Sequence, residues 1–390
     1  MNELTEICRH ARELRDREEP LFTAQVVRVD GSAYRRPGAR MLFTTGRVLA
    51  GSISGGCLEA DVVRSGPWLA SRGPKVRRYE AGGDDERPTG SGCGGTIDVL
   101  IEQDCGVEPA DPVTFIEHCL AEERRGVMAT VYRSTLSSSA VGARLCWELG
   151  QSPSSTIKNP AVEAVLLRVA EELLRGPRAS NRNVVVGESV DALLEIIEPP
   201  PHLFIFGTGA DVLPVLEFAT SLGWNATVCA SKHRPTTGDR FARHTRLLLG
   251  EPKACVDALD RCLHPLALVM SHDFQADTRA LAALLGSRSE YIGVLGPARR
   301  LERLLDELPA LPPFNRLAAV HGPAGLDLGA ETPAEIALSI VSEAQAALRQ
   351  TNAGALRDRP RAPEAPLEPG SGVRLHHADW CANDATRRGA

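Results

Sequence analysis

Apolar residues recur with two different periods along the chain. Residues 3–18 carry their leucines and isoleucine on one face, which predicts an amphipathic helix. The stretches FTAQVVRVDGS and RRPGARMLFTTGRVLAGSI follow, and short apolar runs alternate there with Asp-Gly, Pro-Gly and Thr-Gly turns. That pattern is typical of antiparallel strands. We further expect a helix after residue 57, a strand at TIDVLIE, a serine-rich loop over 137–159 and an amphipathic helix over 161–175.

The pattern changes after the proline run IEPPPHL at residues 197–203. Buried-type strands such as HLFIF, PLALVMS and YIGVLG then alternate with helical stretches, which predicts a parallel, doubly wound sheet. The predicted fold is therefore α/β, with an N-terminal α/β domain built on a mixed sheet (1–196) and a Rossmann-like doubly wound parallel-sheet domain (202–350). The tail 351–390, rich in Pro, Arg, Gly and Asp, is expected to be disordered.

The composition of the chain disfavours several classes of protein: nucleic-acid binders, secreted proteins, membrane proteins and proteins with cysteine-ligated metal sites. The formal net charge of −6 over 390 residues argues against a general nucleic-acid binder. The charged N-terminus has no apolar segment of a secretory signal, and no run of about 18 apolar residues predicts a membrane span. The ten cysteines are scattered without a CxxC pair, which disfavours structural zinc and iron–sulfur ligation. Reduced thiols in the cytoplasm are expected.

The turn GTGADV at residues 207–212 has the setting of a dinucleotide fingerprint, since it follows a strand and opens a helix. Gly207 permits the tight turn, and Gly209 allows the backbone to approach a pyrophosphate. However, Val212 stands in place of the third glycine, and no acidic residue follows at the expected distance for a ribose hydroxyl. The basic residues 232–234 suit a 2′-phosphate. A Rossmann-like scaffold without a nucleotide explains the turn equally well.

The sequence GSISGGCLEA at residues 51–60 places one cysteine among bare backbone. A glycine-rich loop before a helix offers N–H groups to an anion, and a thiolate there is a nucleophile or a soft-metal ligand. Glu59 is a candidate acceptor for a ligand's amino group. Cys93, in SGCGG at 91–95, repeats the arrangement, and RRPGAR adds three arginines, Arg35, Arg36 and Arg40. The alternatives are a buried structural thiol and a solvated basic turn.

These motifs together resemble a known family. GSAYRRPGARMLF, AGSISGGCLEADV and GCGGTIDVLIE are similar to the N-terminal part of the xanthine dehydrogenase accessory proteins of the XdhC/CoxI type. YIGVLGPARRLERLLDEL and GLDLGAETPAEIALSI are similar to the Rossmann domain of the same family, and the resemblance covers residues 5–348 in order.

The resemblance implies a chaperone for molybdenum cofactor (molybdopterin) without turnover of its own. Such a protein protects the cofactor, supports its sulfuration by a cysteine desulfurase, and delivers it to xanthine dehydrogenase or a related molybdenum hydroxylase. The residues implied to contact the cofactor are Cys57, also as a metal ligand, with Gly51, Ser52, Ser54, Gly55, Gly56 and Glu59 around it. We expect Cys93, Arg40, Gly207 and Gly209 to contribute. A homodimer is compatible with the sequence.

Two other functions stay open at this point. An NADP-dependent oxidoreductase would use the 207–212 turn with a catalytic pair such as His272 and Asp273, which follow a predicted strand. An adaptor that only docks on the dehydrogenase would not need a reactive Cys57. For the chaperone, we expect loops 51–57, 90–95 and 207–212 to converge on a cleft between the domains. The tail residues His376, His377 and Cys381 lie outside the resemblance.

Overall fold

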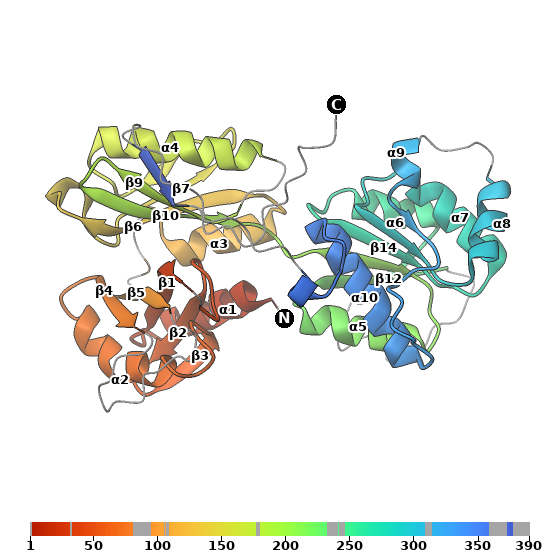
Figure 1. The fold of residues 1–390 in the computed structure, drawn as a ribbon, viewed down its shortest axis with the longest axis horizontal. Helices are drawn as coiled ribbons and strands as arrows, with labels where there is room; N and C mark the ends of the chain where they lie inside the picture. Colours follow the sequence, from red (N-terminus) through yellow and green to blue (C-terminus); the bar gives the residue numbers. More distant parts are fainter. Residues whose placement is uncertain are drawn as a thin grey trace. The chain divides into compact units, whose positions relative to one another are not determined.

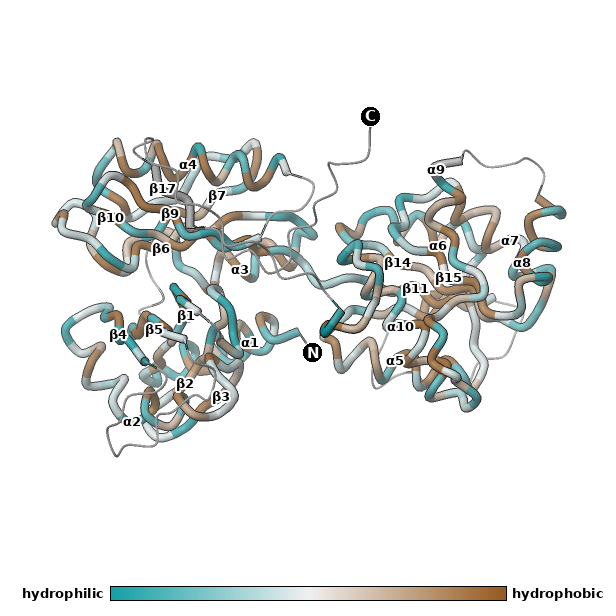
Figure 2. The backbone as a smooth tube through the Cα atoms, viewed as in Figure 1, coloured by the Kyte–Doolittle hydropathy of each residue, from teal (hydrophilic) through white to brown (hydrophobic). Residues whose placement is uncertain are grey.

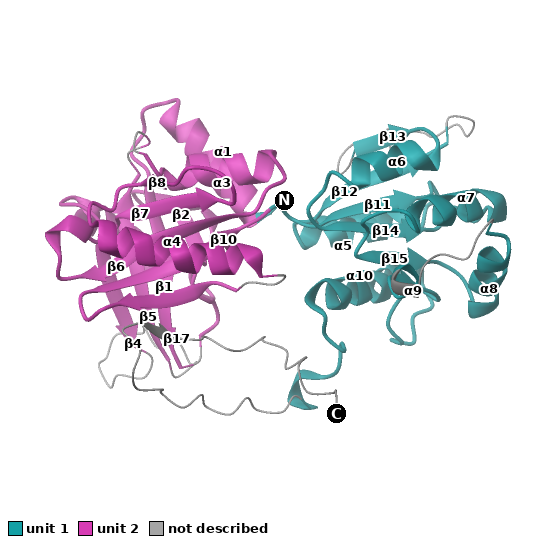
Figure 3. Ribbon diagram, turned by 90° about the horizontal axis from the view of Figure 1, so that it is seen from above, with its two compact units in different colours: residues 1–2, 199–359 teal, residues 3–198, 360–390 magenta. Residues whose placement is uncertain are grey.

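The computed structural model describes residues 2–31, 33–80, 95–104, 106, 109–176, 180–231, 241, 246–308, 314–358 and 373–376. The chain divides into two compact units, coloured separately in Figure 3. The first along the chain, magenta and unit 2 in the key of Figure 3, contains residues 3–198 together with the strand at 373–376 and is called the first unit below. The second unit, teal and unit 1 in that key, contains Asn2 and residues 199–359. The chain passes from one to the other at Pro199, inside the proline run.

The first unit contains two antiparallel sheets (Figure 1). The five-stranded sheet has the order β3 (Arg47–Gly51), β2 (Arg40–Thr44), β1 (Phe22–Asp30), β5 (Thr96–Gln103), β4 (Lys75–Glu80). The six-stranded sheet has the order β17 (Val373–His376), β9 (Arg182–Val186), β10 (Val190–Ile197), β6 (Gly126–Ser134), β7 (Arg144–Glu148), β8 (Ser154–Ser155). Hairpin connections of a few residues join neighbours such as β2 and β3, as antiparallel pairing allows.

The α-helices described in this unit cover these sheets: α1 (Glu3–Arg15), α2 (Glu59–Ala70), α3 (Pro112–Ala121) and α4 (Pro160–Arg175). A short 3-10 helix, η1 (Ser137–Ser139), precedes β7. Helix α2 packs on the five-stranded sheet and α4 on the six-stranded one, while α1 and α3 contribute to a core with residues of both sheets. Val27 and Leu100 of one sheet also pack against Tyr132 and Leu193 of the other. The two sheets therefore share a buried interface.

The second unit is built on one parallel sheet. Its order is β13 (Arg246–Leu249), β12 (Asn225–Ala230), β11 (His202–Phe206), β14 (Pro265–Val269), β15 (Tyr291–Val294), β16 (Val320–His321). The strands run outward from β11 in both directions, so the order reverses between β11 and β14. That is the topological switch point at which doubly wound folds bind ligands.

Helices cover both faces of this sheet. They are α5 (Val212–Ser221), α6 (Pro252–Leu259), α7 (Phe274–Leu284), α8 (Ala298–Asp306), α9 (Phe314–Leu317) and α10 (Pro333–Arg349), followed by the 3-10 helix η3 (Leu356–Asp358). Helices α5 and α10 share one core with the sheet, and α6, α7 and α8 share the other. Strand β14 is predominantly hydrophobic in Figure 2, and every residue of β14 and β15 is buried, as expected for strands covered on both faces.

The predicted fold class, an α/β N-terminal part followed by a Rossmann-like parallel-sheet domain, is confirmed. In detail, the strand pairs described in the first unit are antiparallel rather than mixed. The tail that was expected to be disordered contributes β17, which pairs with β9. Within the described residues, no helix is long and apolar enough to cross a membrane.

Candidate functional site

Cys57 lies on the loop that joins β3 to α2, two residues before the helix begins. Its side chain is exposed. The other free cysteines that the structure describes are all buried: Cys8, Cys119, Cys146, Cys229, Cys255 and Cys262. Among these residues, Cys57 is thus the thiol that a ligand in solution can reach directly, and the alternative of a buried structural thiol does not apply to it.

The Ser54 side chain organises this loop. Its Oγ accepts hydrogen bonds from the backbone N–H of Gly56 (3.2 Å) and of Leu58 (3.1 Å). Leu58 stands at the N-cap of α2 and has no side-chain acceptor, so Ser54 takes over part of the capping from four residues away. The Cys57 Sγ lies 3.6 Å from the same oxygen. One buried hydroxyl therefore fixes the backbone on both sides of the thiol.

Glu59 folds back under the loop. Its carboxylate accepts from the N–H groups of Ser54 (2.8 Å) and Ile53 (3.1 Å) and from the Ser54 hydroxyl. Burial raises the pKa of Glu59, but these hydrogen bonds outweigh it, so the pKa lies below its usual value. Glu59 is therefore an anion that holds the loop together. These hydrogen bonds give its carboxylate a role within the loop, and its contact with a ligand's amino group stays a prediction.

The base of the loop is fixed by close contacts. A Cβ added to Gly51 would lie 2.1 Å from the Arg40 carbonyl oxygen of β2, and Gly51 has a φ of +72°, so this position requires glycine. The Ser52 N–H donates to Glu3 of α1 (3.0 Å), and Arg35 donates to both oxygens of the same carboxylate at 2.6 Å. The predicted basic turn and the cysteine loop are thereby joined through α1.

The outward face of the loop is open. It carries Gly55, Gly56 and Cys57, all exposed. Tyr34 lies beside it, since a Cβ on Gly55 would be 3.9 Å from the tyrosine ring, and 74% of Tyr34 is exposed. Arg36, two residues further along, is exposed as well. A thiol, an aromatic ring and bare backbone thus share one accessible surface of the first unit.

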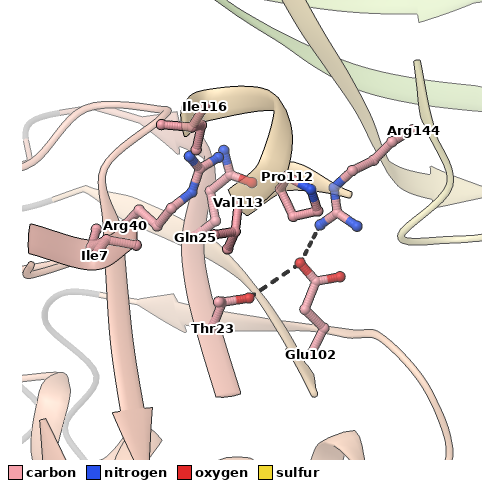
Figure 4. A pocket seen from close by; sticks show the side chains of 9 residues that line it. All are labelled: Ile7, Thr23, Gln25, Arg40, Glu102, Pro112, Val113, Ile116 and Arg144. Atoms are coloured by element: carbon pink, nitrogen blue, oxygen red, sulfur yellow. Dashed lines mark hydrogen bonds and ion pairs between the residues drawn. The ribbon is translucent and has the colours of Figure 1, made fainter. Parts of the chain in front are cut away.

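Arg40 lies elsewhere. It is 5% exposed, and its guanidinium donates to Glu195 of the other sheet at 2.6 Å. Figure 4 shows it lining a small internal cavity together with Gln25 and Arg144. The prediction that Arg40 contacts a cofactor at the loop is corrected by this burial, because its guanidinium points into the unit's interior. Cys93 and the loop at 90–94 lie outside the described residues, as do residues 232–234, His377 and Cys381.

In the second unit, Gly207 and Gly209 form the turn between β11 and α5, as predicted. A Cβ on Gly207 would lie 2.5 Å from the Met270 carbonyl oxygen at the end of β14, so the two chain segments approach closely at the switch point. Val212, in the place of the third glycine, is fully buried in the core that α5 and α10 share.

The suggested pair of His272 and Asp273 does not form. The Asp273 side chain caps α7 by accepting from the Ala276 N–H at 2.9 Å. His272 instead places its Nε2 2.7 Å from Oδ2 of Asp211, which lies 61 residues earlier in the chain. The catalytic pair proposed for an oxidoreductase is therefore absent in that form from the described part of the chain. Sequence spacing gave no signal for the pair that does form.

Protein-family models match parts of both units. The model for the "XdhC and CoxI family" matches residues 14–80, which include the complete Cys57 loop, and the model for the "XdhC Rossmann domain" matches residues 203–344. The chain belongs to the XdhC and CoxI family. The predicted resemblance is confirmed in both units of this XdhC-type chain.

Individual relatives extend the match over most of the sequence. A Bacillus subtilis protein described as a probable subunit of xanthine dehydrogenase is 28% identical over 346 residues, which cover 85% of this chain and 93% of the relative. A solved structure described as a xanthine dehydrogenase from Bacillus halodurans shares 25% identity with a TM-score of 0.69, covering 90% of this chain and 98% of that one. The uncharacterised Escherichia coli protein YqeB is 25% identical over 60% of this chain and 46% of its own length.

Proposed function

We propose that this XdhC-type protein is an accessory factor that binds molybdenum cofactor at the Cys57 loop. It protects the cofactor, supports its sulfuration and passes it to a molybdenum hydroxylase of the xanthine dehydrogenase type. The observation that carries the proposal is the exposed thiol of Cys57 on a loop whose shape is fixed from below by Ser54 and Glu59.

The residues present suit the chemistry of that cofactor. Molybdenum held by dithiolene sulfurs is a soft centre, and a cysteine thiolate is the protein ligand that matches it. The pterin is planar, and the exposed Tyr34 ring beside Gly55 offers an aromatic face to a planar group. The exposed Arg36 supplies a guanidinium for a phosphate. Because Ser54 already uses the N–H groups of Gly56 and Leu58, these two amides are not available to the phosphate.

The proposed partners follow from the same chemistry and from the relatives. Two of them bear the name of xanthine dehydrogenase, which supports a molybdenum hydroxylase as the recipient. Sulfuration requires a donor of activated sulfur, and a cysteine desulfurase is the class of enzyme that supplies it. An open loop with an exposed thiol allows such an enzyme to reach a bound cofactor, and a buried one would not.

The test is retention of molybdenum by the anaerobic protein after incubation with purified cofactor and gel filtration. We expect wild type to retain cofactor and Cys57→Ser to lose most of it. Cys119→Ala, which removes a fully buried thiol from the same unit, is the matched control and should retain as much as wild type. Equal retention by wild type and Cys57→Ser would reject the loop as the binding site.

A further inference from the structure

The carboxyl ends of β11 and β14 hold an acidic residue and a histidine where a doubly wound fold normally receives its ligand. Asp211 is the last residue of the glycine turn after β11, and His272 belongs to the turn after β14. The imidazole Nε2 lies 2.7 Å from the carboxylate Oδ2. The Asp211 side chain is 25% exposed and that of His272 is 61% exposed, so the pair stands at the surface of the switch point.

The Asp211 carboxylate lies against the backbone that a pyrophosphate would approach. A Cβ on Gly209 would be 2.2 Å from Asp211 Oδ1, so this oxygen occupies the space that the missing side chain of Gly209 leaves open. In dinucleotide-binding turns that space belongs to the phosphates. In addition, the N–H groups of Val212 and Leu213 donate to the carbonyls of Gly209 and Ala210 at 3.3 Å. Backbone N–H groups in the first turn of α5 therefore already have hydrogen-bond acceptors. The Asp211 carboxylate lies beside the turn that leads into this helix.

The histidine turn is held rigidly. His272 has a φ of +59°, in the left-handed region that costs free energy for a residue with a side chain. Next to it, Ser271 donates its N–H (3.2 Å) and its hydroxyl (2.5 Å) to Asp277, which is 1% exposed. Arg300 of α8 donates to the other oxygen of Asp277 at 2.7 Å. Two helices, α7 and α8, thus anchor the turn from which His272 reaches Asp211.

We propose that Asp211 determines which ligands this Rossmann unit accepts: its carboxylate, held by His272, takes the place of a phosphate and excludes nucleotides and other pyrophosphate esters. A turn that excludes nucleotides has no need of an acidic residue for a ribose, and the sequence has none at the expected distance. A second anion placed a few ångströms from Asp211 would be repelled, because like charges at that distance interact strongly near a protein surface.

The experiment measures binding of NADPH and of inorganic pyrophosphate to the full chain by titration calorimetry. Wild type is compared with Asp211→Asn, which removes the charge and keeps the shape, and with Asp211→Gly, which empties the turn. We expect the dissociation constant of both ligands to fall by about tenfold or more in the two variants, as relief of a like-charge contact predicts. Glu217→Gln is the matched control, since it removes an exposed carboxylate from the same helix. Circular dichroism verifies that each variant is folded.

Each outcome supports or overturns the proposed role of Asp211. Weak or no binding by wild type with a gain in both Asp211 variants alone supports the proposal. Tight NADPH binding by wild type overturns it, because the turn would then be open. No gain in folded Asp211 variants overturns it as well, since another feature must close the turn. An equal gain in Glu217→Gln would overturn it too, because overall charge, not the position of Asp211, would then control binding.

Discussion

Ser54 connects more of the cysteine loop than any neighbouring side chain, since its hydroxyl accepts two backbone N–H groups and donates to Glu59. Ser54→Ala should lower the free energy of unfolding by about 1–2 kcal/mol, the usual cost of losing a helix cap with a buried hydrogen bond. Urea denaturation measures this. Ser52→Ala is the control, because Ser52 donates its backbone N–H to Glu3 and the substitution keeps that N–H. Equal losses in both variants would contradict the assigned role of Ser54.

Glu59 makes the loop sensitive to acid. Its pKa in the folded protein lies below the usual value of 4.5, because hydrogen bonds to Ser54 and Ile53 outweigh the effect of burial. A depressed carboxylate pKa contributes stability that is complete above 4.5 and is lost as the pH falls through the folded pKa. The stability difference between wild type and Glu59→Gln should therefore be largest at neutral pH and shrink below pH 4.5. Denaturation curves across this range test it, and a difference independent of pH would disprove it.

The hairpin of β2 and β3 leads into the cysteine loop. Substitutions at two of its glycines distinguish the cost of backbone strain from the cost of a steric clash. Gly46→Ala, at φ +92° with nothing within 4 Å, should cost about 1–2 kcal/mol of backbone strain alone. Gly51→Ala adds a clash with the Arg40 carbonyl, so its cost should reach the order of 4 kcal/mol. Thermal unfolding of both variants compares the two. Similar losses of stability in the two variants would contradict this prediction, because β2 and β3 would then move apart readily enough to relieve the clash at Gly51.

Elements with a clear period were predictable, and elements stabilised by distant partners were not. The helix expected over 161–175 is α4, and the glycine turns expected between β strands are present. Strand β7 was missed within the loop expected over 137–159, because all five of its residues are buried and no alternation marks it. Its charged ends tolerate burial only through partners elsewhere: Arg144 pairs with Glu102, and Glu148 with Arg124.

The candidate site shows the same division. The exposure of Cys57 follows from its glycine neighbours and was foreseeable, because little apolar side chain is available to cover it. The inward turn of Glu59, the burial of Arg40 and the meeting of Asp211 with His272 each depend on residues distant in sequence or on the path of the backbone. Local pattern carries no information on such contacts.

At the scale of the whole first unit, two buried ion pairs connect the two sheets, and each sheet supplies one arginine and one glutamate. Arg40 of the five-stranded sheet pairs with Glu195 of the six-stranded sheet. Arg144 of the six-stranded sheet pairs with Glu102 of the five-stranded one, as Figure 4 shows. The Arg40 Nη1 and Arg144 Nε atoms have no hydrogen-bond partner among the described residues. These pairs fix how the sheets align, at a cost in desolvation.

Removing one member of the Arg40–Glu195 pair should lower the stability of the protein more than removing both. Arg40→Met leaves Glu195 buried without its cation and should cost about 3–5 kcal/mol, whereas Arg40→Met with Glu195→Met should recover much of that loss. A double-mutant cycle by chemical denaturation provides the comparison. If the double variant is less stable than Arg40→Met by the full cost of a second substitution, the buried pair is not coupled as the structure indicates.

Bound cofactor should cover Cys57 if the proposed function is correct. The most direct measurement is the rate of anaerobic alkylation of Cys57 by iodoacetamide, followed by peptide mass spectrometry, with and without purified molybdenum cofactor. The exposed thiol should react quickly in the free protein and at least several-fold more slowly once the cofactor is bound, while the buried Cys119 reacts slowly in both states. An unchanged rate at Cys57, under conditions where the protein retains molybdenum, would place the cofactor elsewhere on the molecule.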